Sequence, residues 1–126
     1  MLCILVARLA ARMQSIADRS EEGISIVSRD RGVFYRNESF YKIWGNEFRK
    51  IKDTEKSIKV MRPLLENPDD LFGSWYAGVN SHKKQEATVR FKDGRHYRFY
   101  LEPISEGGKR SGVVAFFREI AKGWTP

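Results

Sequence analysis

The stretch from Ala87 to Ile120 constrains this sequence most, because it predicts three consecutive antiparallel strands. Apolar and polar residues alternate at 87–92 and again at 97–102, which is the two-residue period of a strand with one apolar face. Asp93-Gly94 between them is a strong two-residue hairpin signal, since both positions tolerate a positive φ angle. These residues therefore predict a hairpin that must bury one aromatic face.

The rest of this stretch predicts where the second strand ends and where the third one lies. Pro103 is expected to end the pairing of the second strand, because proline has no N–H to donate. Glu106-Gly107-Gly108-Lys109 predicts the next turn, and residues 112–117 are apolar on both faces, as in a central strand. Val113, Ala115 and Phe117 are expected to point inward. Three such strands are not stable alone, so the upstream segments must cover them.

The upstream segments predict a second hairpin followed by helices. Residues 24–28 and 33–35 are rich in β-branched and aromatic residues and flank a turn at 30–32. Asn37 is expected to cap a helix from Glu38 to Trp44, which Gly45 would end in the left-handed conformation.

Short helices and loops are expected at 46–62, and a longer helix follows them. Asn67 is its expected cap and Pro68 lies in its first turn. The fold class is therefore α+β: a five-stranded antiparallel sheet with short helices across one face and an N-terminal helix flanking the other. The expected core is Ile26, Phe40, Trp44, Leu71, Trp75, Val89, Phe91, Tyr97, Phe99, Leu101, Val113 and Ala115.

Residues 2–17 predict the N-terminal helix through a heptad-like apolar stripe. This helix can lie on the outer sheet face, where Val114 and Phe116 would point, or pair with a second copy of itself. We expect a homodimer that uses both surfaces. The expected divisions are 1–19 for the helix, 20–121 for the domain and 122–126 for a tail. The stripe consists of Leu2, Val6, Leu9, Met13 and Ile16.

Composition limits the function classes. The chain has 126 residues, enough for one domain, and a formal net charge of +7. Its only cysteine, Cys3, allows no internal disulfide and favours a reducing, cytoplasmic compartment. No apolar segment approaches the ~20 residues of a membrane-spanning helix. Nucleic-acid binding ranks last, because the aromatic residues are expected to point inward. Its candidate basic residues are Arg29, Arg31, Arg36, Lys50, Lys52, Lys56 and Lys59.

Catalytic signals are weak. The two histidines and Cys3 lie far apart in sequence and form no nucleophile–base pair. No spacing of His, Cys, Asp or Glu matches a metal site, and Gly107-Gly108 belongs to a strand turn rather than a phosphate loop. The sequence therefore predicts a binding protein rather than an enzyme, with no metal.

An ordered set of segments resembles the PAS domains of bacterial sensor histidine kinases and related signalling proteins. The matching segments are Glu22–Val27, Val33–Phe40, Ile43–Gly45, Asn67–Asp69, Asp93–Arg95, Pro103–Ile104, Gly112–Val114 and Phe116–Ile120. The resemblance implies a sensory or regulatory module that passes a ligand- or partner-dependent change of state to an output domain or partner. The alternative is a ligand-free dimerisation module of the same fold.

The chain departs from this family at its last strand. The family commonly ends in an Asp-Ile-Thr type triplet that ties the strand to the output linker, whereas this chain has Glu119-Ile120-Ala121. The acid is one methylene longer and the hydroxyl is missing. By resemblance, the expected structural and signalling residues are Asn37, Asp93, Gly94, Arg118 and Glu119.

The resemblance also implies a pocket between sheet and helices. A flavin photosensor needs a cysteine in the helical region, which Cys3 does not supply, and His82 and His96 are expected on the surface, which disfavours haem. Non-covalent flavin remains open, with Trp44 and Trp75 as core residues in the simpler interpretation. Arg95 or Arg98 is expected either in solvent or beside an anionic group at the pocket mouth. The ligand-pocket candidates are Phe40, Trp44, Phe72, Trp75, Tyr76, Phe91, Tyr97 and Phe99.

Overall fold

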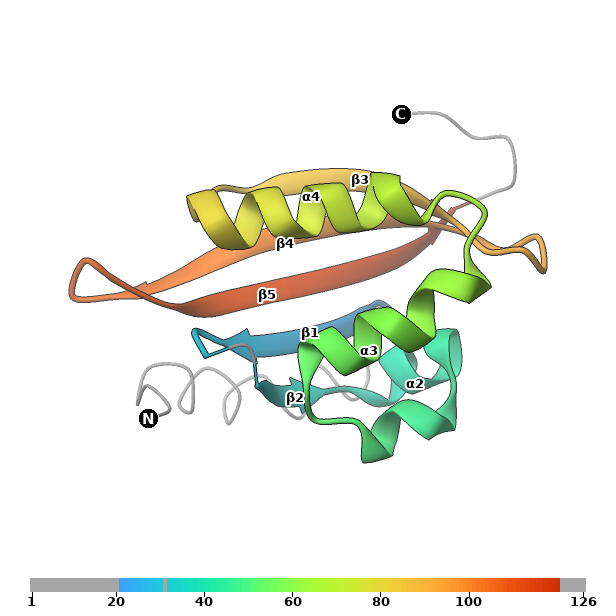
Figure 1. Cartoon of the computed structure of the whole chain (residues 1–126), viewed down its shortest axis with the longest axis horizontal. Coiled ribbons are helices and arrows are strands. Elements are labelled where there is room, and N and C mark those ends of the chain that lie inside the picture. Colours follow the sequence, from blue (N-terminus) through green and yellow to red (C-terminus); the bar gives the residue numbers. More distant parts are fainter. Residues whose placement is uncertain (1–20, 31, 121–126) are drawn as a thin grey trace.

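The computed structural model describes residues 21–30 and 32–120, which form an antiparallel sheet with helices across one face (Figure 1). The strand order is β2-β1-β5-β4-β3, so β5 is central, as its apolar composition predicts. This confirms the predicted sheet, while the N-terminal stripe and the C-terminal tail lie outside the described residues. The strands are β1 (Gly23–Ser28), β2 (Val33–Arg36), β3 (Gln85–Arg90), β4 (His96–Glu106) and β5 (Lys109–Ile120).

All the described helices lie between β2 and β3 in the chain. α4 packs along β3 and β4, whereas α2 packs on β1, so the two ends of the sheet are covered by different helices (Figure 1). α3 lies between them in the chain and contributes to the same helical layer. The helices are α2 (Glu38–Trp44), the 3₁₀ turns η1 (Asn46–Lys50) and η2 (Arg62–Leu64), α3 (Thr54–Met61) and α4 (Pro68–Ser81).

The two predicted turns of the β3–β4–β5 meander form, but only one has the predicted length. Glu106 pairs with Lys109 across a two-residue turn, in which Gly107 and Gly108 have φ angles of 57° and 80°. The β3–β4 turn is one residue longer, because the Phe91 N–H donates to the Arg95 carbonyl at 2.9 Å. Only Gly94 takes a positive φ there, at 98°, and so the two-residue prediction for Asp93-Gly94 was wrong.

Pro103 does not end β4, contrary to the prediction. β4 continues to Glu106, and Pro103 pairs with Val113 of β5. The partner strand on the other side, β3, starts opposite Leu101, so at Pro103 β4 has a neighbour on one side only. An edge position of this kind tolerates a residue without an N–H.

The core is divided between the two faces of the sheet. Except for Ile26, every residue expected in the core packs in one cluster under the helices. Ile26 lies on the outer face with Ile24, Ile104 and Val114, because it pairs with the outward-facing Val114 of β5. Strand alternation places its neighbour Val27 inside instead. The predicted outward direction of Val114 and Phe116 is confirmed.

Two predicted helix ends differ from the prediction, one in its capping hydrogen bond and one in its backbone angles. Asn67 precedes α4 but makes no capping hydrogen bond with its side chain. Instead its amide donates to the Thr88 carbonyl at 2.7 Å and accepts from the Arg90 N–H at 2.9 Å, so it hydrogen-bonds along β3. Gly45 ends α2 with φ 121° and ψ 152°, which is a positive φ outside the predicted left-handed helical region.

Candidate functional site

A small, partly open cavity lies between the inner sheet face and the helices. Its volume is about 40 Å³, and its walls come from β1, β2, β4, β5, α2, α3 and α4. Ile58, Met61 and Leu71 contribute apolar surface, whereas one end is polar. The cavity thus lies between the sheet and the helices, which is where the resemblance implies a pocket. Its polar lining residues are Ser25, Arg36, Thr54 and Ser57.

The ligand-pocket candidates divide into two groups of equal size. The cavity is lined by Phe40, Phe72, Trp75 and Phe99, but not by Trp44, Tyr76, Phe91 and Tyr97. Trp44 packs in the neighbouring core, with its ring centroid 4.8 Å from that of Phe91. The Tyr76 hydroxyl donates to Glu55 at 2.9 Å on the outside of the helical layer. The second group therefore supports the cavity walls rather than forming them.

Arg36 forms the polar end of the cavity. The residue is only 8% exposed, and it is the last residue of β2. Its Nη2 donates to the Ser57 hydroxyl at 3.0 Å and its Nη1 to the Ile51 carbonyl at 3.2 Å. Longer contacts of 3.4 Å join Nε to the Ser25 hydroxyl and Nη1 to the Phe48 carbonyl. All these acceptors are neutral.

The charge of Arg36 is therefore unusual for the protein interior. No carboxylate in residues 21–30 and 32–120 forms an ion pair with it. Its guanidinium carbon lies 4.5 Å from the centroid of the Phe40 ring, which gives partial compensation. Burial lowers the pKa of Arg36 to about 10, so the side chain stays charged at neutral pH.

Arg36 is one of the candidate basic residues for nucleic-acid binding, the interpretation that ranks last, and its burial removes it from any such surface. A signal for the inward direction exists in the register of the first hairpin. Arg36 pairs with Ser25 of β1, and Ser25 shares its strand face with Val27, which lies in the inner core. A polar pair on an otherwise apolar strand face is the pattern that points to this site.

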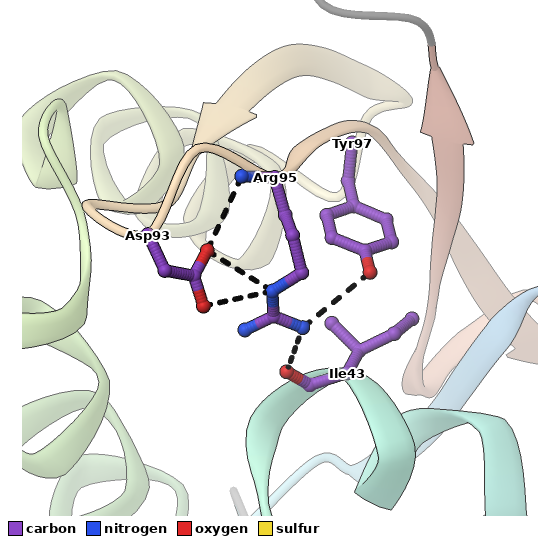
Figure 2. Close-up of polar contacts among 4 residues, drawn as sticks. All are labelled: Ile43, Asp93, Arg95 and Tyr97. Atoms are coloured by element: carbon purple, nitrogen blue, oxygen red, sulfur yellow. Dashed lines mark hydrogen bonds and ion pairs between the residues drawn. The ribbon is translucent and has the colours of Figure 1, made fainter.

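Arg95 is not at the cavity mouth but fastens the β3–β4 turn to α2 (Figure 2). Its Nη1 donates to the Ile43 carbonyl at 2.8 Å, and its Nε pairs with Asp93 at 2.9 Å. The guanidinium also stacks over Phe91, 4.3 Å from the ring centroid. The Tyr97 hydroxyl lies 3.5 Å from Nη1, and burial raises the pKa of this phenol. Asp93 and Arg95 together thus form a structural contact.

Arg98 also lies away from the cavity. Its Nη2 pairs with Glu86 at 2.8 Å and its Nη1 donates to the Thr88 hydroxyl at 3.0 Å. Both partners belong to the adjacent strand β3. Neither Arg95 nor Arg98 therefore lines the cavity, and each is ion-paired, with the Arg95 side chain 35% exposed and that of Arg98 15% exposed.

Asn37 joins α2 to the first strand. Its Oδ1 accepts from the Phe40 N–H at 2.9 Å, which confirms the predicted cap, and from the Ile24 N–H at 2.8 Å. Its Nδ2 donates to the Glu22 carbonyl at 2.9 Å. Because the side chain is only 1% exposed, these bonds are shielded from water.

The last strand is tied to the first one by Arg118 rather than by the acid that follows it. Arg118 pairs with Glu22 at 2.7 Å, near the start of β1. Glu119 is exposed, and within the part of the chain that the structure describes it forms no ion pair. The tie that the resemblance implies runs from the acid to the output linker, which lies outside the described residues, so the ion pair of Arg118 is a separate contact.

The described residues contain no cluster of metal ligands, and they place no histidine in the cavity where it could ligate haem iron. They contain no group of three or more His, Cys, Asp or Glu side chains that could hold a metal ion. His82 Nε2 lies 2.9 Å from the Ser105 hydroxyl, and neither His82 nor His96 lines the cavity. Within the same residues, no helix is long and apolar enough to span a membrane.

Comparison with known proteins identifies the fold. No protein-family model matches the chain, and no curated protein matches it. Among solved structures, the PAS domain of Bordetella pertussis BvgS is 12% identical, with a TM-score of 0.65 over 92% of this chain and 89% of that one. A sensory box sensor histidine kinase from Vibrio cholerae is 17% identical, with a TM-score of 0.57 over 92% and 94%. A PAS domain from Colwellia psychrerythraea is 18% identical, with a TM-score of 0.55 over 89% and 97%. The chain has the PAS fold.

Proposed function

We propose that this chain is a sensory or regulatory PAS module, which passes a ligand- or partner-dependent change of state to an output domain or a partner signalling protein. The observation that carries the proposal is the small cavity with a buried cation at one end. The similar structures include sensor histidine kinases, which supports a role in a signalling protein of the two-component kind. That role is binding rather than catalysis, since the lining offers hydrogen-bond donors and apolar surface.

The central strand provides a route from the cavity to the end of the domain. Ala115 and Phe117 of β5 line the cavity, and β5 ends at Ile120. Arg118, next to Phe117, carries the ion pair to Glu22. A ligand that moves β5 would therefore alter a contact between the two ends of the domain, which is the role we propose for Arg118 and Glu119.

The second candidate function is a ligand-free dimerisation module of the same fold. It is favoured by the small cavity and by the dense aromatic packing beside it. Phe117 packs against Phe40, Trp44 and Phe99, with ring centroids 5.4 to 6.1 Å away. In this alternative the cavity is a packing defect, and the outer sheet face is the functional surface.

Non-covalent flavin does not fit the cavity in its present shape. An apolar cavity of about 150 Å³ holds a single benzene, whereas this one measures about 40 Å³. A three-ring cofactor would require the helices to move away from the sheet. We therefore expect any ligand of this cavity to be small.

The two candidate functions are distinguished by asking what the purified chain binds. We expect native mass spectrometry, absorbance spectroscopy and a thermal-shift screen of small metabolites to identify a ligand that stabilises the fold. A colourless protein of unmodified mass that no compound stabilises would contradict the sensory proposal and favour the dimerisation module.

A further inference from the structure

The buried guanidinium of Arg36 retains hydrogen-bonding capacity that the protein does not use. Arginine has N–H groups on Nε, Nη1 and Nη2, two of them on each Nη. Nε contacts Ser25, the Nη1 hydrogens contact the Phe48 and Ile51 carbonyls, and one Nη2 hydrogen reaches Ser57. The second Nη2 hydrogen has no acceptor among the described residues.

The charge itself is also uncompensated. Burying a cation is costly unless an anion accompanies it, and neutral carbonyl and hydroxyl oxygens compensate only in part. The Ser57 hydroxyl donates onward to the Asp53 backbone carbonyl at 3.1 Å, so this chain of hydrogen bonds also ends on a neutral oxygen. An anion next to Arg36 would supply both the missing acceptor and the missing charge.

A second unused donor belongs to the same cavity. The indole Nε1 of Trp75 is buried and has no hydrogen-bond partner among the described residues, and Trp75 lines the cavity. Buried polar groups are normally hydrogen-bonded, so each exception needs an explanation. Trp75 is therefore a second residue of the cavity lining with an unused donor.

The remaining walls of the cavity are apolar and favour a ligand that has an apolar group next to its acceptor oxygens. Ile58, Met61, Phe72 and Phe99 present aliphatic and aromatic surface toward the cavity. A water needs at least about 10–15 Å³ of such a cavity, so a volume of about 40 Å³ has room for roughly three waters. A ligand of four or five heavy atoms therefore requires the lining side chains to move outward.

From these observations we propose that the cavity binds a short-chain monocarboxylate of about the size of acetate or propionate, with its carboxylate on Arg36 and its alkyl group against the apolar wall. The inference rests on the proposed sensory function and names the chemical class of its ligand. Inorganic anions share the charge but lack the alkyl group, and neutral amides share the shape but lack the charge.

The first test uses the unaltered chain and NMR titration with acetate, propionate, propionamide and nitrate. We expect saturable shifts for propionate at millimolar concentration, because so few heavy atoms limit the affinity. They should include the Arg36 Nε–H signal and amides of cavity residues such as Ser57. Propionamide should bind at least about tenfold more weakly, because it loses the charged hydrogen bond to Arg36. Nitrate should also bind at least about tenfold more weakly, because it has no alkyl group to bury.

The second test compares two arginine variants. Arg36→Gln should weaken propionate binding by about tenfold to a hundredfold. Arg95→Gln is the matched control, because Arg95 also donates to a helix carbonyl but does not line the cavity. It should bind propionate as the unaltered chain does. If Arg36→Gln does not fold, the comparison of propionate with propionamide on the unaltered chain decides the question.

Different failures have different meanings. No saturable shift with either carboxylate, or equal binding of propionate and propionamide, would overturn the monocarboxylate proposal. A tighter effect of nitrate than of propionate would also overturn it, since the apolar wall would then play no part. The sensory function is tested separately in the same spectra. Propionate that binds at Arg36 without shifting Arg118, Glu119 or Ile120 would support the ligand class and contradict transmission along β5.

Discussion

At the scale of single residues, Asn37 does more than cap a helix. The cap to Phe40 is local, and so the sequence predicts it. The bonds to Ile24 and Glu22 join segments that are 13 and 15 residues away, and only the folded hairpin brings them together. The helix cap of Asn37 is therefore predictable from the neighbouring sequence. Its tertiary bonds to Ile24 and Glu22 are not.

Asn37→Ala should lower the free energy of unfolding by about 2–4 kcal/mol, because it removes the cap and leaves the buried Ile24 N–H without an acceptor. Urea denaturation measures this change. Asn37→Ser is the informative control, since serine is a good cap but too short to replace both other contacts. If Ser restores full stability, the bonds to Ile24 and Glu22 contribute nothing and the tertiary role is wrong.

Arg36, Asn67 and Arg95 show which residue roles were beyond sequence reasoning. Their acceptors belong to other elements: Phe48 and Ile51 for Arg36, and Thr88 for Asn67. Arg95 reaches Ile43, 52 residues away in the chain. Local patterns identify caps, turns and apolar faces, whereas a long polar side chain can turn toward solvent or into the fold. For Asn67 and Arg95 that direction depends on the packing of elements that no local pattern describes, whereas for Arg36 the pairing with Ser25 in the first hairpin indicates it.

At the scale of elements, β1 and β5 approach so closely that one position requires glycine. Gly112 has a φ angle of 156°, and a Cβ there would lie 2.2 Å from the Val27 carbonyl oxygen. The apolar run at 112–117 predicts the strand and its central position. The close approach depends on the register between Ser28 and Gly112, which arises only when the two hairpins pair.

Gly112→Ala should lower the free energy of unfolding by about 3 kcal/mol or more, because it combines a disfavoured backbone angle with a clash against main chain. Gly107→Ala is the matched control. Its φ is 57°, but no atom lies within 4 Å of the added Cβ, so backbone strain of roughly 1–2 kcal/mol is the whole cost. Equal losses for the two variants in thermal or urea unfolding would contradict the close packing of β1 on β5.

The hairpins themselves were the most predictable elements, because their period and their turn glycines are local. Pro103 is the instructive exception. A proline argues against pairing only where both sides of a strand have partners, and β3 leaves one side free from Leu101 onward. The length of β4 therefore depends on where β3 starts opposite it. The sequence of β4 alone does not give that information.

At the scale of the whole molecule, the outer face of the sheet is a second apolar surface. Ile24, Ile26, Ile104 and Val114 cluster there, and Phe34, Tyr35 and Phe116 pack against them. An antiparallel sheet commonly has one face toward solvent, with polar residues on it. An apolar outer face instead favours a contact, and the sequence offers the stripe Leu2, Val6, Leu9, Met13 and Ile16 as its complement.

We therefore predict a homodimer in which this stripe contacts both the outer sheet face and the stripe of a second copy. A helix of this length is marginal in water by itself, and five large apolar positions exceed what one narrow surface would bury. Val6→Glu with Leu9→Glu should give a monomer in sedimentation equilibrium while circular dichroism shows an intact sheet. Gln14→Glu, which changes a position off the stripe, should leave the dimer unchanged. A monomeric unaltered chain at tens of micromolar, or a dimer that survives the double replacement, would show that the stripe is not the dimer contact.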